Sequence, residues 1–138
     1  MIGSRTSAFA TAATTFAALT ATLALTAPAA HAAVWRVDVS PGASIGLGSL
    51  RYGSSCSYTV TVEGRPGDAA WFHDIGAYGT FSPQSVTIGS NGRATTNWTP
   101  QVAGWHRIYA DSYFGQASTD YFEVGTCINL GSACVVLR

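Results

Sequence analysis

The side chains that could support catalysis are His73, Asp74, His106 and Asp111, together with several serines. These residue types can supply a general base, an orienting carboxylate and a nucleophile. The sequence contains neither a G-x-S-x-G nor an H-E-x-x-H motif, and its carboxylates are scattered singly. His73 and Asp74 are adjacent in an expected strand, so their side chains leave opposite faces and cannot share a metal there. The sequence therefore predicts a protein that is not an enzyme, with a secreted hydrolase as the weakest alternative.

Three cysteines, Cys56, Cys127 and Cys134, form a second candidate group. They lack a C-x2-C spacing and no histidine adjoins them, so we expect no metal and no cofactor. In an oxidising compartment we expect one disulfide and one remaining thiol. We favour Cys56 with Cys134, because that bond removes more entropy from the unfolded chain, and Cys127 with Cys134 stays open as the alternative. The protein is expected to be a monomer, and the odd cysteine offers a route to a covalent dimer.

The first 32 residues have the three parts of a cleaved export signal: the basic Arg5, an apolar run from Ala8 to Ala27, and the small-x-small sequence Ala30-His31-Ala32. We expect cleavage there, one domain over residues 33–138, and a secreted, extracellular protein that is either released or associated with the cell surface. No second apolar run approaches the roughly 18 residues of a membrane-spanning helix. The sequence thus predicts no membrane span after cleavage.

Charge gives no indication of a partner. Seven basic residues balance seven acidic ones, and neither kind is clustered. Nucleic-acid binding needs a basic stripe or patch, so we expect no nucleic-acid partner.

The dominant pattern along the chain is alternation of apolar and polar residues between turn sequences, which indicates antiparallel strands with one buried face. In the clearest case, Cys56, Tyr58, Val60 and Val62 alternate with polar residues. About seven short strands in one small domain are typical of a β-sandwich. The expected strands are 35–39, 56–62, 69–74, 85–88, 93–99, 105–112 and 117–124. The glycine-rich stretch 76–83 is expected to be a flexible connection.

The segment from Gly89 to Ala110, GSNGRATTNWTPQVAGWHRIYA, resembles the immunoglobulin-like domains of secreted and surface bacterial proteins. In those domains a G-x-A-x-x-x-[WF]-T-P strand precedes A-G-x-[HY]-x-[IL]-x-A. The resemblance implies an all-β, immunoglobulin-like antiparallel sandwich. It also implies that the following residues point inward: Ala94, Thr96, Trp98, His106, Ile108 and Ala110. The tail from Gly125 to Arg138 is similar to the ends of small secreted actinobacterial proteins, and we expect it to form a disulfide-tethered extension with an added edge strand.

The same alternation places a set of aromatic and polar side chains on the outer face of one sheet. If His106 points inward, then Trp105 and its alternate neighbours point outward. In the same way, Phe72 inward places Trp71 and His73 outward. The resemblance implies that these two strands, 69–74 and 105–112, are neighbours in one sheet. Such residue types are enriched where partners bind. Alternatively, these side chains are covered by the tail or by residues 76–83, or they form cross-strand pairs. The expected binding face consists of Trp71, His73, Trp105, Arg107, Tyr109 and Tyr121.

These features together predict a secreted, non-enzymatic binding module that recognises a protein or an envelope glycan. One alternative is a small-molecule carrier of the antibiotic-binding type, which requires a deep apolar pocket. Another is a secreted hydrolase inhibitor that presents a loop closed by Cys127 and Cys134.

Overall fold

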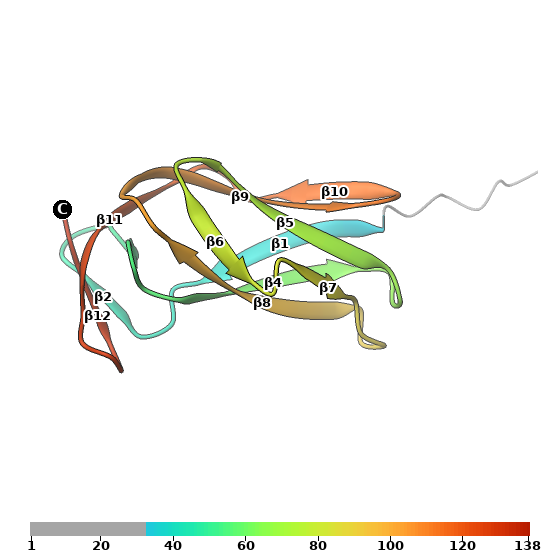
Figure 1. Cartoon of the computed structure of the whole chain (residues 1–138), viewed down its shortest axis with the longest axis horizontal. Coiled ribbons are helices and arrows are strands. Elements are labelled where there is room, and N and C mark those ends of the chain that lie inside the picture. The colour runs from blue at the N-terminus through green and yellow to red at the C-terminus, as the bar shows by residue number, and fades with distance from the viewer. Residues whose placement is uncertain (1–32) are drawn as a thin grey trace, which may run out of the picture.

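The computed structural model describes residues 33–138, and the predicted export signal lies outside the described residues. The described part consists of strands and turns in two sheets that face each other (Figure 1). It contains no helix that could cross a membrane. The first sheet has the strand order β1 (Val34–Ser40), β4 (Tyr58–Gly64), β8 (Arg93–Pro100) and β6 (Gly79–Ser82). The second has the order β2 (Ser44–Gly46), β12 (Cys134–Leu137), β11 (Phe122–Asn129), β9 (Gly104–Ser112), β5 (Ala69–Gly76) and β7 (Ser85–Thr87), with β3 (Tyr52–Gly53) beside β11 and β10 (Gly115–Ser118) beside β9.

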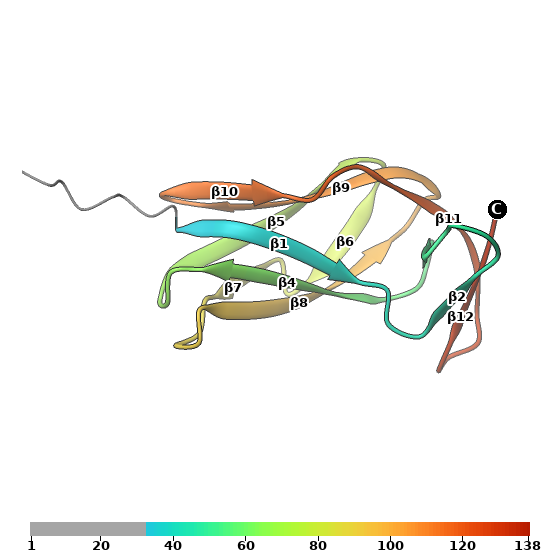
Figure 2. The ribbon, with the colours of Figure 1, turned by 180° about the vertical axis from the view of Figure 1, so that it is seen from behind.

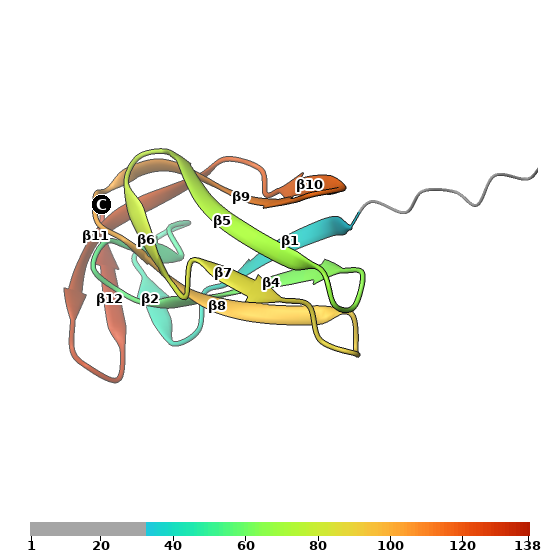
Figure 3. The ribbon, with the colours of Figure 1, turned by 45° about the vertical axis from the view of Figure 1, so that its right-hand side comes forward.

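The core forms where the alternating apolar residues of the two sheets meet, as expected for a sandwich. In β4 the side chains of Tyr58, Val60 and Val62 are buried, in agreement with the predicted alternation. Trp98 of β8 is fully buried, and its ring lies 5.8 Å from that of Tyr58. Figure 3 shows the two sheets as separate layers, with β5 and β9 in one and β4 and β8 in the other. The prediction of an immunoglobulin-like sandwich is therefore confirmed at the level of architecture.

The predicted inward residues of the two motif strands are the ones that the sandwich buries. Thr96 and Trp98 are buried on β8, while Ala94 is half-buried near the start of that strand. On β9, His106, Ile108 and Ala110 are fully buried. β5 and β9 pair in an antiparallel register, as the resemblance implies for neighbouring strands.

The expected continuous strand 117–124 is wrong, because the chain is divided there into β10 and β11. Ser118 lies opposite Tyr109 and Phe122 lies opposite His106, so the five residues 118–122 face the four residues 106–109. The extra residue is a β-bulge. Thr119 stabilises it, since its hydroxyl accepts a hydrogen bond from the Ile108 N–H and its own N–H donates to the Ile108 carbonyl.

Two further expectations need correction. The stretch 76–83 is not only a connection, because it contains β6, which pairs with β8 in the first sheet. The tail does add a strand, but β12 lies inside its sheet, between β11 and β2, and β2 forms the edge. Figure 2 shows β2 and β12 side by side at the end of the molecule where the chain terminates.

Candidate binding face

The six residues predicted to form the binding face lie together on the outer side of the second sheet. The register places Trp71 opposite Asp111 and His73 opposite Tyr109. Trp105 and Tyr121 are 60% and 52% exposed, which leaves large aromatic surfaces in contact with solvent. His73 is also exposed, whereas Trp71, Arg107 and Tyr109 are half-buried by their neighbours. Neither the tail nor β6 covers this side, since β12 lies within the second sheet between β11 and β2, and β6 pairs with β8 in the first sheet.

Neighbouring side chains hold one another in place across this outer face, which we call the aromatic face. The Arg107 guanidinium lies 5.5 Å from the centre of the Tyr121 ring and donates to Ser118 Oγ at 2.6 Å. The same guanidinium donates through Nε to the Thr119 carbonyl at 3.0 Å. The His73 and Tyr109 rings are 6.2 Å apart. Side chains ordered in this way lose little rotamer entropy when a partner binds.

The face extends beyond the predicted set. The turn between β9 and β10 carries Tyr113 and Phe114, which are 82% and 68% exposed. The Tyr113 ring meets that of Trp71 edge-on at 5.1 Å, so the turn is continuous with the face. Ile75 of β5 is also exposed and lies opposite Arg107. The two adjacent aromatic residues directly before Gly115 were the signal in the sequence that could have revealed this extension.

Two open clefts adjoin the Trp105 end of the face. One, of about 370 Å³, lies between β1 and residues 118–122, and the other, of about 260 Å³, lies between residues 49–52 and β9. Tyr52 and Phe122 line both clefts, and their rings are 4.8 Å apart. The larger cleft combines Tyr121 with the polar side chains of Asp38, Ser118, Thr119 and Asp120. This lining differs from the deep apolar pocket that a hydrophobic carrier requires.

Beneath the face, two of the four candidate catalytic residues, Asp74 and His106, form a buried network with Trp98. His106 donates from Nδ1 to Asp74 Oδ2 at 2.8 Å, and from Nε2 to the Val102 carbonyl at 2.8 Å. The indole of Trp98 donates to the same Asp74 Oδ2 at 2.8 Å. The other carboxylate oxygen, Oδ1, is buried and has no hydrogen-bond partner. Trp98 and His106 also meet edge-on, with ring centres 5.4 Å apart.

The hydrogen bonds of this network keep His106 protonated to a higher pH than an isolated histidine. Burial lowers the pKa of His106, but the hydrogen bond to Asp74, the bond to the Val102 carbonyl and the Asp74 charge together raise that pKa above its ordinary value of 6.5. A carbonyl oxygen can only accept, so His106 Nε2 carries a proton and the second proton lies between Nδ1 and Asp74. Since the imidazole is fully buried and both its nitrogens are occupied, the geometry gives His106 a structural role. Among the described residues, no serine hydroxyl is hydrogen-bonded to it.

The three cysteines converge at the end of the molecule where β2 and β12 lie. Their sulfur atoms all lie within 4.8 Å of one another. The Cα atoms of Cys134 are 6.3 Å from Cys56 and 6.2 Å from Cys127, both within the usual disulfide range, whereas Cys56 and Cys127 are 7.1 Å apart. The favoured pairing of Cys56 with Cys134 is therefore compatible with the backbone, and so is the alternative. Sequence spacing did not reveal that all three meet.

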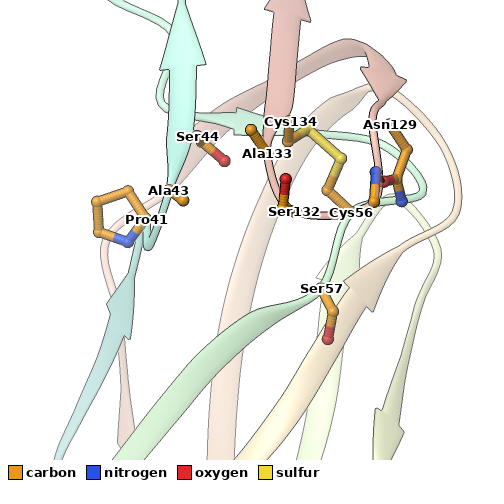
Figure 4. A pocket seen from close by; sticks show the side chains of 10 residues that line it. Pro41, Ala43, Ser44, Cys56, Ser57, Asn129, Ser132, Ala133 and Cys134 are labelled. Carbon is orange, nitrogen blue, oxygen red and sulfur yellow. Dashed lines mark hydrogen bonds between the residues drawn. A yellow bond between two sulfur atoms is a disulfide. The ribbon is translucent and has the colours of Figure 1, made fainter.

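A pocket of about 170 Å³ lies beside the cluster. Figure 4 shows the side chains of Cys56 and Cys134 joined at its wall, with Ser44, Ser57, Asn129 and Ser132 around them.

No protein-family model matches the sequence, and no curated protein matches it. Solved structures that resemble the fold include fragments of intimin. The D00-D0 domain of intimin has a TM-score of 0.56 at 11% identity, over 72% of this chain and 50% of that chain. The D0-D1 domain of intimin has a TM-score of 0.53 at 12% identity, over 67% and 49% of the two chains.

A third similar structure is the C-terminal 282-residue fragment of intimin in complex with the intimin-binding domain of the translocated intimin receptor. Its TM-score is 0.52 at 14% identity, over 69% of this chain and 34% of that chain. The chain thus spans half or less of each of these structures, and identities this low relate the fold alone. The described residues form an immunoglobulin-like β-sandwich, similar in fold to these domains of intimin.

Proposed function

We propose that this protein is an exported, non-enzymatic binding module that recognises a protein or an envelope glycan at the cell surface. The observation that carries the proposal is the aromatic face, a continuous set of exposed and mutually ordered aromatic side chains on β5, β9 and the turn after β9. From Trp105 to Asp111 the face follows seven residues of β9, and the six rises between them span about 20 Å. That length suits an extended peptide or a short run of sugar rings.

The composition of the face supports binding over solvation alone. Trp, Tyr and Arg residues account for most strong contacts at protein interfaces, because they are large, rigid and amphipathic. The face adjoins the cleft with Asp38 and Asp120, so carboxylates and hydroxyls are available beside aromatic rings. One intimin fragment of similar fold was solved in complex with a protein receptor domain, and this supports the protein alternative.

The test measures binding of the purified, processed protein to cells of the producing organism and to glycan isolated from their envelope. Trp105→Ala is expected to weaken binding at least tenfold, which corresponds to about 1.4 kcal/mol. The matched control is Trp35→Ala, since Trp35 is 52% exposed but lies on β1 in the other sheet. The proposal fails if neither substitution changes binding, or if both weaken it equally.

The two partner classes can be separated in the same assay. Loss of binding after protease treatment of the cells indicates a protein partner. Retained binding to the isolated glycan, abolished by Trp105→Ala, indicates an envelope glycan.

A second candidate function, inhibition of a hydrolase, is favoured by the hairpin formed by β11 and β12. Ile128 and Leu130 are 52% and 63% exposed there, close to Cys127 and Cys134. An inhibitor would present these apolar side chains in a constrained loop. Leu130→Ala should abolish inhibition of a target protease or glycosidase if this function is correct, while Trp105→Ala should leave it unchanged.

A further inference from the structure

We propose that Cys56, Cys127 and Cys134 form a thiol–disulfide exchange site, in which Cys134 shares one disulfide between two partners. Each sulfur can join only one other sulfur, so three converging cysteines contain one disulfide and one thiol. Both pairs that include Cys134 have Cα separations within the disulfide range, at 6.3 and 6.2 Å. The third pair, at 7.1 Å, is outside that range. Cys134 is therefore the shared sulfur.

The exchange step is balanced without an oxidant. Starting from a Cys56–Cys134 bond, the Cys127 thiol loses its proton to water and its thiolate attacks Cys134 Sγ. The Cys127–Cys134 bond forms, the Cys56–Cys134 bond breaks, and the electron pair leaves with Cys56 Sγ, which takes up a proton from water. The attacking sulfur must lie in line with the bond that breaks, so the Cys127 side chain has to rotate out of the compact cluster.

The surroundings of the cluster keep the three sulfurs together. A Cβ at Gly53 would press on Cys127 Cβ and Sγ, so the glycine leaves space for the Cys127 side chain. The Tyr58 hydroxyl lies 3.7 Å from Cys134 Sγ and also contacts the backbone of Gly53, which links the shared cysteine to the strand beside Cys127. Asn129 Nδ2 donates to the Ser55 carbonyl at 3.2 Å and so holds the turn before Cys56 against β11.

The two states differ in what the disulfide connects. The Cys56–Cys134 bond joins β12 to the turn that precedes β4 and closes one wall of the 170 Å³ pocket. The Cys127–Cys134 bond lies within the β11–β12 hairpin and leaves the Cys56 thiol at that pocket. Exchange therefore moves the thiol from half-buried Cys127 to Cys56 at the pocket wall, and removes the covalent link between the hairpin and the turn before β4.

The folded structure must favour the Cys56–Cys134 bond, because an unfolded chain would strongly prefer the Cys127–Cys134 bond. The two bonds close loops with sequence separations of 78 and 7 residues. The probability that a loop closes falls with the three-halves power of its length. An unfolded chain should therefore form Cys127–Cys134 about 40 times as often as Cys56–Cys134. Folding removes this entropic difference by bringing all three cysteines together.

The test is peptide mapping of the full processed protein after acid quenching and alkylation with N-ethylmaleimide. Native protein incubated at mildly alkaline pH should contain both pairings. In concentrated guanidinium the ratio of Cys56–Cys134 to Cys127–Cys134 should fall towards the ratio of about one to 40 expected for the unfolded chain. After removal of the denaturant it should return to the native value without added thiol, at a rate independent of protein concentration.

Three variants complete the test. Cys127→Ser and Cys56→Ser should each hold a single disulfide and serve as standards for the two states. Cys134→Ser should contain two free thiols and no intramolecular bond. A Cys56–Cys127 bond in Cys134→Ser, a native pairing that does not interconvert, or three reduced thiols around a bound metal would each overturn the proposal.

Discussion

Replacing Asp74 with asparagine should change the pH dependence of the free energy of unfolding. The pKa of His106 is raised above 6.5 in the folded protein, chiefly because the bonds to Asp74 and Val102 outweigh the effect of burial. A group whose pKa is raised on folding stabilises the folded state fully below its unfolded pKa, and this contribution is lost as the pH rises through the folded pKa. The stability of the wild-type protein should therefore fall as the pH rises above about 6.5, with a slope of at most about 1.4 kcal/mol per pH unit for the single proton.

The size of the effect follows from burial. The side chains of Asp74 and His106 are 2% and 0% exposed, so neither water nor salt can replace the lost partner. Removing one member of a buried ion pair costs about 3 to 5 kcal/mol. Asp74→Asn should lose this amount near pH 6, where His106 is protonated, and the difference from wild type should shrink as the pH rises.

The assay is urea unfolding of both proteins between about pH 6 and pH 8, followed by fluorescence. The matched control is His73→Gln, because His73 is the exposed neighbour of Asp74 and its replacement leaves the buried bonds between Asp74, His106 and Trp98 in place. If wild-type stability does not fall above pH 6.5, or if Asp74→Asn keeps the wild-type slope, the interpretation of the buried network is wrong.

Three further predictions test other parts of the structure by the same unfolding measurement or by peptide mapping. Trp98→Ala should lower the free energy of unfolding by about 3 to 5 kcal/mol, because the indole is fully buried. Trp105→Ala should change it by less than about 0.5 kcal/mol, because Trp105 is exposed. Equal losses of stability would contradict the opposite orientations of the two side chains. Gly79→Ala should destabilise by about 1 to 3 kcal/mol, since its Cβ would collide with Asp74 Oδ2 and Trp98 Nε1, and an unchanged midpoint would contradict this contact. Gly53→Ala should shift the disulfide ratio towards Cys56–Cys134 by displacing Cys127, and a ratio equal to wild type would show that Gly53 does not position that thiol.

Much of the sandwich was predictable because alternation of side chains is a local property of a strand. It correctly gave the buried faces of β4, β8 and β9, and with the family resemblance it paired β5 with β9. The same alternation also contained a signal that was not used. Phe72 inward places Asp74 inward, on a strand next to inward His106, and a buried carboxylate beside a buried imidazole should pair.

The remaining features depend on contacts between distant residues. β2 and β3 have only three and two residues, and each pairs in parallel with a strand near the end of the chain. Segments this short carry no periodicity that could identify them. The bulge at Thr119 depends on side-chain bonds to Ile108 and Arg107, and the convergence of the cysteines depends on how β11 and β12 fold back. The binding role of the aromatic face also remains a prediction, because exposure shows which side chains are available and not what they bind.

The position of β12 has a consequence for the order of assembly. This strand follows all the others along the chain, yet it lies between β11 and β2, so neither neighbour can complete its hydrogen bonds before residues 134–137 are in place. Until then, one edge of β11 and one edge of β2 are unpaired, and Cys134 is not in place to form a disulfide. Assembly of this end must therefore wait until residues 134–137 have been synthesised, and a variant truncated before Cys134 would leave the same edges exposed to pairing with another copy.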